Sequence, residues 1–451
     1  MRTSTIWYGI MRIGALSAAL AIAFALNLRP ASAVPSFGIQ TSQPCSACHV
    51  GSYGPRLKTA GRDFKLYGYA SSDNKDHGLP FNANARASFT HTDADQAGGA
   101  SDGFDVNDNF AFDGLTLSFA GKIVDQVGAV ARLSYNGIKG VWQWGGVDIR
   151  YAKDATWFGH DVVFGITVNN GPTRTDLWES ALSGAPTASS GLSRRPKAAP
   201  IAGSLSGLVA GAGIYAMWND LIYLEFSAYD GFNRDTLNAL GVDPLNGRDS
   251  FDGLIPYGRI AVQKEFDEGH HFIELGAYAL RANVFPRDID TAGTNEFLDV
   301  DVDAMYQWIA DPSLSTSDTF TARVAYLHEQ EKLDASRALF GTNAVDNLST
   351  WRADLSYSVD ATITATAHYF QTTGDNDVVR WGTPGGKIDT TGWIGQLDYV
   401  PWGKPDSPLD WLNVRLTLQY MAYDEFNGRS DNASDKNTLL VGFTIVGTTN
   451  Q

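Results

Sequence analysis

The chain has 451 residues, a mass of 48.8 kDa and a formal charge of −16, from 34 Lys and Arg against 50 Asp and Glu. This acidic balance argues against nucleic acid as a partner, because phosphates require a basic protein face. Apolar residues make up 43% of the chain and only two residues are cysteine. The first value excludes a disordered polyanion, and the second excludes a scaffold built on disulfides.

The first 33 residues have the three-part order of a secretory signal. Arg2 and Arg12 give a positive start, an apolar run follows over residues 13–26, and residues 31–33 (Ala-Ser-Ala) form a small-residue cleavage site. The apolar run is shorter than the ~18 residues that a membrane helix needs. We therefore predict that residues 1–33 are a signal peptide and that the rest of the chain is exported.

Both cysteines lie in one short motif, Cys45-Ser46-Ala47-Cys48-His49. This spacing is typical of covalent haem c, in which two thiols bond the porphyrin and the adjacent imidazole ligates the iron. A dithiol redox site would be expected in a thioredoxin-like βαβ setting, which the chain lacks. A zinc site needs further ligands at regular spacing, and a plain disulfide leaves His49 unexplained. The motif therefore predicts one haem c, attached through Cys45 and Cys48, with His49 as the axial metal ligand.

The residues around this motif resemble those of a known family. Val34-Pro35-Ser36-Phe37-Gly38-Ile39-Gln40-Thr41 stands before the motif, and Pro55, Leu57, Gly61-Arg62, Phe64-Lys65 and Gly68-Tyr69 follow it. This pattern is similar to the N-terminal signature of the fused monohaem cytochrome c–porin family, the outer-membrane iron oxidases of iron-oxidising bacteria. The resemblance implies a monohaem cytochrome c segment over residues 34–80 and a sixteen-stranded outer-membrane barrel over residues 81–451.

From residue 81 the chain shows short segments in which apolar and polar residues alternate, as expected of half-buried strands. Sixteen strands are predicted, near 81–92, 109–123, 127–137, 142–153, 160–169, 207–217, 221–229, 256–265, 271–283, 296–308, 318–330, 348–358, 361–371, 391–401, 411–424 and 437–446. The connections between them are alternately short and long for most of the chain. A barrel with short periplasmic turns and long outer loops gives this alternation, which a soluble sandwich does not require. The predicted fold is an all-β barrel of the cell outer membrane, in contact with lipid.

The longest connection, residues 170–206, has two interpretations. It is the third outer loop, and in trimeric porins that loop folds inward as a constriction. Its Gly, Ser, Ala and Pro content, with Arg194, Arg195 and Lys197 among them, instead favours a flexible surface loop. We expect a surface loop.

Residues 34–80 are too few for a self-sufficient core, because domains near ~40 residues usually need a cofactor or another staple. A barrel of sixteen strands has a lumen wide enough to be filled. We therefore expect the haem segment to lie in the lumen as a redox plug. The second axial ligand stays open among four side chains that could reach the lumen or the haem segment: Met305, Met421, His368 and His77. An iron with five ligands, or with water as the sixth, is equally compatible with the sequence.

Asp299, Asp301 and Asp303 alternate with apolar residues on one predicted strand, so their carboxylates would line the lumen. Such a row could favour the entry of a cation. It could also be ordinary lining, with Arg323 of the next strand as its counter-charge.

Together these features predict an electron conduit of the outer membrane. It would oxidise extracellular Fe(II), as an iron oxidase, and pass the electron through one haem c to a periplasmic carrier. One alternative is the same conduit with a different electron donor or acceptor. The other is a diffusion porin whose haem segment is only a plug.

Overall fold

The computed structural model describes residues 35–75, 80–182, 190–242, 249–409 and 411–448. All described residues belong to one compact unit, Ser32–Gln451. The predicted signal peptide, residues 1–33, lies outside the described residues. In the described part of the chain, no helix is both long and apolar enough to cross a membrane.

Short helices come first and strands follow. The helical elements before the strands are α2 (Pro35–Thr41), α3 (Cys45–Cys48), η1 (Val50–Ser52) and α4 (Thr59–Leu66). The strands are β1 (Phe81–Thr92), β2 (Asn109–Val124), β3 (Val127–Asn136), β4 (Val141–Trp157), β5 (His160–Asn169), β6 (Val209–Trp218), β7 (Ile222–Gly231), β8 (Ser250–Asp252), β9 (Ile255–Phe266), β10 (His271–Phe285), β11 (Asn295–Ile309), β12 (Thr319–Lys332), β13 (Val345–Val359), β14 (Ile363–Gly374), β15 (Thr390–Tyr399), β16 (Leu412–Glu425) and β17 (Thr438–Thr448). The connections between strands carry α5 (Ile201–Ser204), α6 (Arg234–Ala239), η2 (Pro286–Asp288), α7 (Asp334–Phe340), α8 (Val378–Trp381), η3 (Pro384–Gly386) and η4 (Ala433–Lys436).

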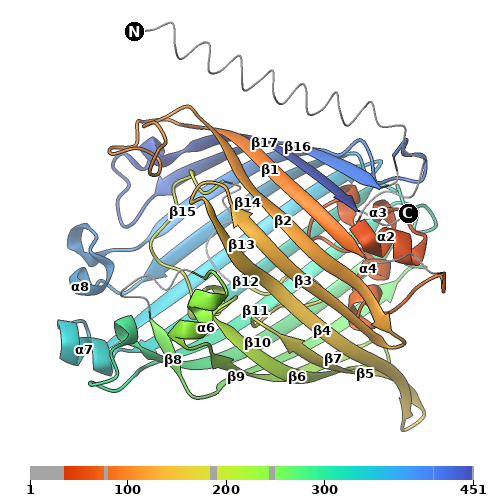
Figure 1. Ribbon diagram of the computed structural model, residues 1–451, viewed down its shortest axis with the longest axis horizontal. Coiled ribbons are helices and arrows are strands. Elements are labelled where there is room, and N and C mark those ends of the chain that lie inside the picture. The colour runs from red at the N-terminus through yellow and green to blue at the C-terminus, as the bar shows by residue number, and fades with distance from the viewer. Residues whose placement is uncertain (1–34, 76–79, 183–189, 243–248, 410, 449–451) are drawn as a thin grey trace, which may run out of the picture. The chain divides into compact units, whose positions relative to one another are not determined.

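The strands form one closed antiparallel barrel, in which each strand pairs with its neighbours in sequence and β1 also pairs with β17 (Figure 1). β8 and β9 are two pieces of one strand position, since both pair with β10, through Asp252 opposite Asn283 and Tyr257 opposite Leu280. The barrel therefore has sixteen strand positions. The predicted fold class is confirmed, and each predicted strand lies within a few residues of the observed one.

Strand β11 shows how the two faces of the wall differ. Asp299 and Asp301 are fully buried, whereas Val300 and Val302 are 45% and 51% exposed. Polar side chains therefore face the lumen and apolar ones face outward, the inverse of a soluble protein and the pattern of an outer-membrane barrel in lipid. The same arrangement, repeated around the barrel, places the protein in the outer membrane.

Tight turns join the strands at one end of the barrel. Asn219 and Asp220 between β6 and β7 both have positive φ, 52° and 49°, as do Asp360 and Ala361 between β13 and β14, each at 48°. A type I′ turn needs positive φ at both central positions, and Asn and Asp tolerate it best among residues other than Gly. The long loops lie at the opposite end. In barrels of this class the short turns are periplasmic and the long loops are outside.

The barrel closes along a seam between β1 and β17, which pair from Asn82 opposite Thr448 to Thr92 opposite Thr438. The first helices lie against the inner face of this seam. The backbone N–H of Ser36 donates to the side-chain oxygen of Asn82 on β1 at 2.7 Å, and Cys45 packs against Val446 on β17. The start of the chain's described part therefore contacts both strands of the seam.

The connection 170–206 folds into the lumen in its described part. Leu177, Trp178, Leu182 and Leu205 are each at most 1% exposed, and they pack against lumen-facing residues of the wall. The prediction of a surface loop is therefore wrong. The small and polar residues that suggested flexibility surround a few large apolar side chains, and these anchor the loop inside the barrel.

Candidate functional site

Residues 35–75, called the plug below, occupy the lumen near the short-turn end of the barrel. Several wall side chains bond directly to its backbone: Asn413 on β16 donates to the Ser52 carbonyl at 3.0 Å, and Tyr215 on β6 donates to the Leu66 carbonyl at 2.8 Å. The Ser52 hydroxyl in turn donates to the carbonyl of Ala361, in a short turn, at 2.8 Å. The expectation that this segment lies in the lumen is confirmed.

Helix α4 ends where the plug meets the wall. Gly68 follows the helix with φ of +65°, and the backbone N–H of Tyr69 returns to the Phe64 carbonyl at 3.0 Å, a left-handed helix end that favours glycine. A Cβ at position 68 would lie 3.0 Å from the Arg150 Cβ on β4. Glycine is thus required here both for the backbone turn and for the close approach of α4 to the wall.

Gln40 joins three parts of the structure. Its side-chain amide donates to the carbonyls of Tyr69 and Ser71 at 2.8 and 2.7 Å, and its side-chain carbonyl accepts from the backbone N–H of Lys122 on β2 at 2.7 Å. One buried amide therefore fixes the two ends of the plug to each other and to the barrel.

The Cys45–His49 motif begins with a single turn of helix, α3, which carries both thiols. Burial raises the pKa of Cys45, and the neighbouring Cys48 raises it further; burial also raises the pKa of Cys48. Redox-active cysteines instead need a lowered pKa to supply thiolate. These surroundings oppose the dithiol redox alternative.

His49 lies directly after α3. Its Nδ1 is buried and makes no hydrogen bond within the described residues, and burial lowers the pKa of its imidazole, which favours the neutral form that ligates metals. A buried ring nitrogen without a partner is unusual. The donor set of two thiols and one neutral imidazole fits covalent haem. In the part of the chain that is described, no cluster of three or more His, Cys, Asp or Glu forms a separate metal site.

The structure separates the candidates for the second axial ligand. Met305 and Met421 face the lumen and are buried, but they pack in two different apolar clusters. The cluster of Met305 includes Leu66 of the plug and Trp178 of the inward loop, whereas that of Met421 includes Phe370 and Tyr423. His368 also faces inward, with a buried Nε2 that has no hydrogen-bond partner among the described residues. It lies opposite Asp354 on β13. His77 lies outside the described residues.

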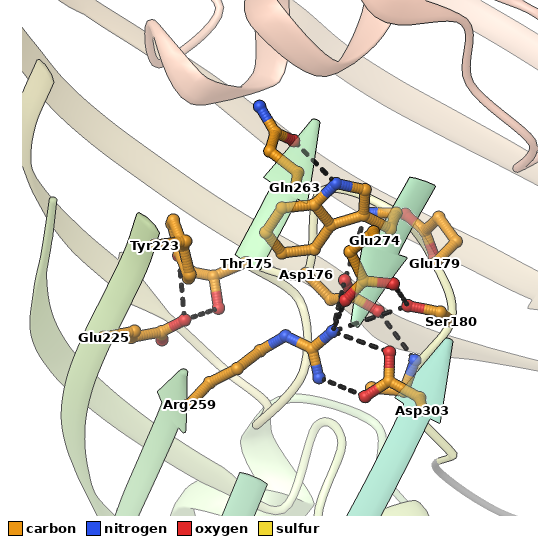
Figure 2. Close-up of polar contacts among 12 residues, drawn as sticks. Thr175, Asp176, Glu179, Ser180, Tyr223, Glu225, Arg259, Gln263, Glu274 and Asp303 are labelled. Carbon is orange, nitrogen blue, oxygen red and sulfur yellow. Dashed lines mark hydrogen bonds and ion pairs between the residues drawn. The ribbon is translucent and has the colours of Figure 1, made fainter. Parts of the chain in front are cut away.

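The inward loop is held by a charged network around Arg259 of β9 (Figure 2). The Arg259 guanidinium forms two bonds with Asp303, at 2.8 and 2.9 Å, and one with Glu274 of β10, at 3.1 Å. Asp176 of the loop lies 3.5 Å from the same guanidinium. Arg259 has the lumen-facing parity of its strand, so alternation could have flagged it, but its loop partner could not be read from the sequence.

The predicted acidic row of β11 does line the lumen, with Asp299 and Asp301 fully buried and Asp303 4% exposed. The suggested counter-charge is wrong, because Arg323 forms its salt bridge with Asp354 of β13 at 3.0 Å. Register explains the difference: Arg323 lies directly opposite Asp354. Within the described residues, the member of the row that forms a salt bridge with an arginine is Asp303, and its partner is Arg259.

A cavity of about 560 Å³ opens toward the long-loop end of the barrel. Its lining includes Lys139, Trp144, Phe297, Glu329 and Arg380, together with the loop residues around α5. The cavity is therefore bounded by the wall on one side and by the inward loop on the other, away from the haem motif. We call it the outer cavity.

No family model and no curated protein matches the chain. Solved structures similar in fold include the outer membrane channel DcaP of Acinetobacter baumannii, at 12% identity and a TM-score of 0.46, covering 84% of this chain and 99% of that one. An anion-selective porin from Comamonas acidovorans has 10% identity and a TM-score of 0.42, over 83% and 100%. OmpT of Vibrio cholerae has 11% identity and a TM-score of 0.40, over 83% and 99%. At these scores the likeness carries no inference about what the chain does.

Proposed function

We propose that this outer-membrane barrel is an electron conduit that oxidises extracellular Fe(II) through one haem c and delivers the electron to a periplasmic carrier. The observation that supports it most is the place of the haem motif. Cys45, Cys48 and His49 lie in a plug that is bonded to the lumen wall near the short-turn end. A redox group there can be approached by a carrier from the periplasm.

Cys45 and Cys48 would hold the haem through thioethers, and His49 would supply the axial nitrogen. The haem would supply a one-electron couple. The chain's own residues fix its place, since Gln40, Asn413 and Tyr215 bond the plug to the wall. The resemblance of residues 35–69 to the fused cytochrome–porin family supports Fe(II) as the donor. The same structure would serve a different donor or acceptor equally well.

A diffusion porin is the second candidate, because the fold is that of a porin-like barrel. Two features oppose it. The plug occupies the lumen at one end, and the anchored loop with Leu177 and Trp178 occupies it farther toward the outer cavity. Solutes would need a water path past both.

The first experiment tests attachment. Denatured wild-type protein should stain for haem, and Cys45→Ser and Cys48→Ser should each weaken or abolish the stain, because each removes one thioether. His49→Ala should change the haem spectrum even where attachment survives. Ser46→Ala is the matched control, since Ser46 lies inside the motif and is also buried, and it should keep the stain. Absence of haem from the wild-type protein overturns the proposal.

The second experiment tests the reaction. Fe(II) added to the purified wild-type protein should reduce the haem faster than Fe(II) added to the His49→Ala variant, as followed by the reduced-minus-oxidised haem spectrum. Solute flux through liposomes that contain the protein, without reduction of haem by Fe(II), would instead establish the porin.

A further inference from the structure

Three arginines meet in the lumen beside the haem motif. They are Arg56 of the plug, Arg323 of β12 and Arg352 of β13, and we call them the arginine cluster. The Arg56 guanidinium bonds Asp354 of β13 at 3.1 Å, and Arg323 bonds the same carboxylate at 3.0 and 3.2 Å. Arg352 lies two residues before Asp354 on the lumen face of that strand, ~7 Å along it. One carboxylate therefore lies between three guanidinium groups.

Arg352 is the member of the cluster that has no carboxylate of its own. Within the described part of the chain it forms no salt bridge, and its guanidinium donates to the carbonyl of Ser180 in the inward loop at 3.3 Å. Asp301 and Asp176 attract it more weakly than Asp354 does, and Asp354 already bonds the two other arginines. A guanidinium largely withdrawn from water without a counter-charge is unfavourable. The cluster thus carries a positive charge that an anion would balance.

Two buried nitrogens at the cluster also lack partners. Nε of Arg56 and Nε2 of His368 make no hydrogen bond within the residues that the structure describes. His368 lies directly opposite Asp354 in the register of β13 and β14, and the charges of all three arginines act on it. Buried polar atoms without partners are uncommon in folded proteins, and both of these nitrogens can donate to an anion.

The arginine cluster adjoins the residues that would hold the haem. The backbone N–H of Val50, the residue after His49, donates to the Arg56 carbonyl at 3.0 Å. In the inward loop, the Glu179 carbonyl accepts a hydrogen bond from the Arg323 guanidinium at 2.7 Å, and the charge of Glu179 acts on His49. Plug, loop and wall therefore place the cluster close to the axial histidine.

We propose that the arginine cluster binds the propionate carboxylates of the haem, an inference that rests on the haem of the proposed function. A guanidinium pairs with a carboxylate through two parallel hydrogen bonds. Haem c carries two propionates besides its thioether bonds, so three guanidinium groups would face three carboxylates, those of Asp354 and the propionates. The cluster would orient the haem in the lumen and keep both propionates ionised. A free carboxylate or phosphate has the same chemistry, and the experiment separates the two sources.

The test is the reduction potential of the haem in the purified full-length protein, measured by spectroelectrochemistry over a range of pH. Arg352→Gln removes the charge but keeps an N–H donor for the Ser180 carbonyl. Because a propionate without its counter-charge favours ferric haem, the equilibrium constant for haem reduction should fall about tenfold at alkaline pH, which is ~59 mV for one electron. The potential should also rise more steeply than in wild type as the pH falls, since such a carboxylate takes up a proton more readily and the proton favours the reduced haem.

Three further variants sharpen the test. Arg352→Lys keeps the charge and should keep most of the wild-type potential. Arg281→Gln is the matched control, because it removes the same charge from a side chain that is 56% exposed and bonds Glu296; its potential should equal that of the wild type. Should Arg352→Gln fail to fold, Arg56→Gln removes another charge of the cluster and should change the potential and its pH dependence in the same direction.

An unchanged potential in Arg352→Gln would overturn the proposal. So would a lower potential with the pH dependence of the wild type, since the arginine would then act on the haem only at a distance. Inorganic phosphate added to the wild-type protein should leave the potential unchanged, and a saturable shift would show that the cluster takes a free anion instead of the propionates. Absence of haem from the wild-type protein, by staining, contradicts the proposed function and is a separate result.

Discussion

The plug and the inward loop both fill the lumen, but they are held there by different interactions. In the plug, polar side chains are buried: Ser36, Gln40, Ser46, Ser52, Lys58, Arg62 and Lys65 are all at most 8% exposed. In the loop, large apolar side chains such as Leu177, Trp178 and Leu182 are buried beside the charged network that Asp176 joins. The plug thus depends mainly on hydrogen bonds of defined direction, whereas the loop combines burial of apolar area with that network. Directional contacts suit the segment that is proposed to hold a haem at a fixed place.

The largest effect is expected where one side chain contacts both segments. Arg150 of β4 bonds Asp148 at 2.9 Å, the Lys65 carbonyl of the plug at 3.0 Å and the Arg174 carbonyl of the loop at 3.1 Å. Arg150→Met leaves Asp148 buried with its charge unbalanced, which should lower the free energy of unfolding by about 3–5 kcal/mol. Urea unfolding in lipid vesicles measures this. Arg281→Met, at an exposed pair with Glu296, should cost less than about 1 kcal/mol.

A change confined to the loop comes next. The Trp178 indole N–H donates to Gln263 at 2.9 Å, and its ring meets that of Tyr223 edge to face at 5.5 Å. Trp178→Ala should cost about 3 kcal/mol, the lower end for buried Trp, because a loop can partly relax. Conductance in planar bilayers should rise while haem staining stays. Trp157→Ala, at a side chain 67% exposed, is the control, and an unchanged conductance in Trp178→Ala would show that the loop does not restrict the lumen.

A smaller effect is expected where the two segments touch each other. The Lys65 ammonium of the plug donates to the Asp176 carbonyl and, at 2.7 Å, to the carboxylate of Glu179, both in the loop. Lys65→Met should cost about 1.5–3 kcal/mol, as for a hydrogen bond from a charged group. In a double-mutant cycle with Glu179→Gln the coupling should be below about 1 kcal/mol, because Glu179 is 37% exposed. A coupling above about 3 kcal/mol would mean that plug and loop act as one unit.

The smallest perturbation tests which end each segment faces. Epitope tags near Gly241 or Asp431, in the long connections, should be reachable on intact cells, and tags near Asp220 or Gly269, in the short turns, should not. The alternation of connection lengths gives this assignment. Equal labelling of all four positions would contradict this assignment, and the plug could then no longer be assigned to the periplasmic end or the outer cavity to the outer end.

The strands could be predicted because a wall between lipid and lumen imposes a strict period of two. Leu298, Val300 and Val302 alternate with Asp299, Asp301 and Asp303 in the sequence, and the same residues alternate outward and inward in the structure. The haem motif is local as well, and the haem c that it indicates stays a prediction. The place of the segment in the lumen could be predicted from its small size.

The contacts inside the lumen could not be predicted, because they join residues far apart in the chain. Nothing in the sequence near Glu329 indicates that the backbone of residue 201 donates to it, or that Arg323 pairs with Asp354 and not with the acidic row. The inward fold of the loop did leave a signal. Leu177 and Trp178 are large apolar residues in a connection whose other residues are mostly small or polar. A surface loop would expose these two side chains to water.

The position of the plug at the seam has a consequence for the lifetime of the folded state. A closed barrel has no free strand edge, so the pairing of its first and last strands is where it can open sideways. Ser36 bonds Asn82 on one side of this pairing, and Cys45 packs against Val446 on the other. Separating the two strands would therefore also displace the plug. We therefore expect the contacts that place the plug to slow unfolding, so that the persistence of this barrel in the membrane depends on a rate as well as on an equilibrium.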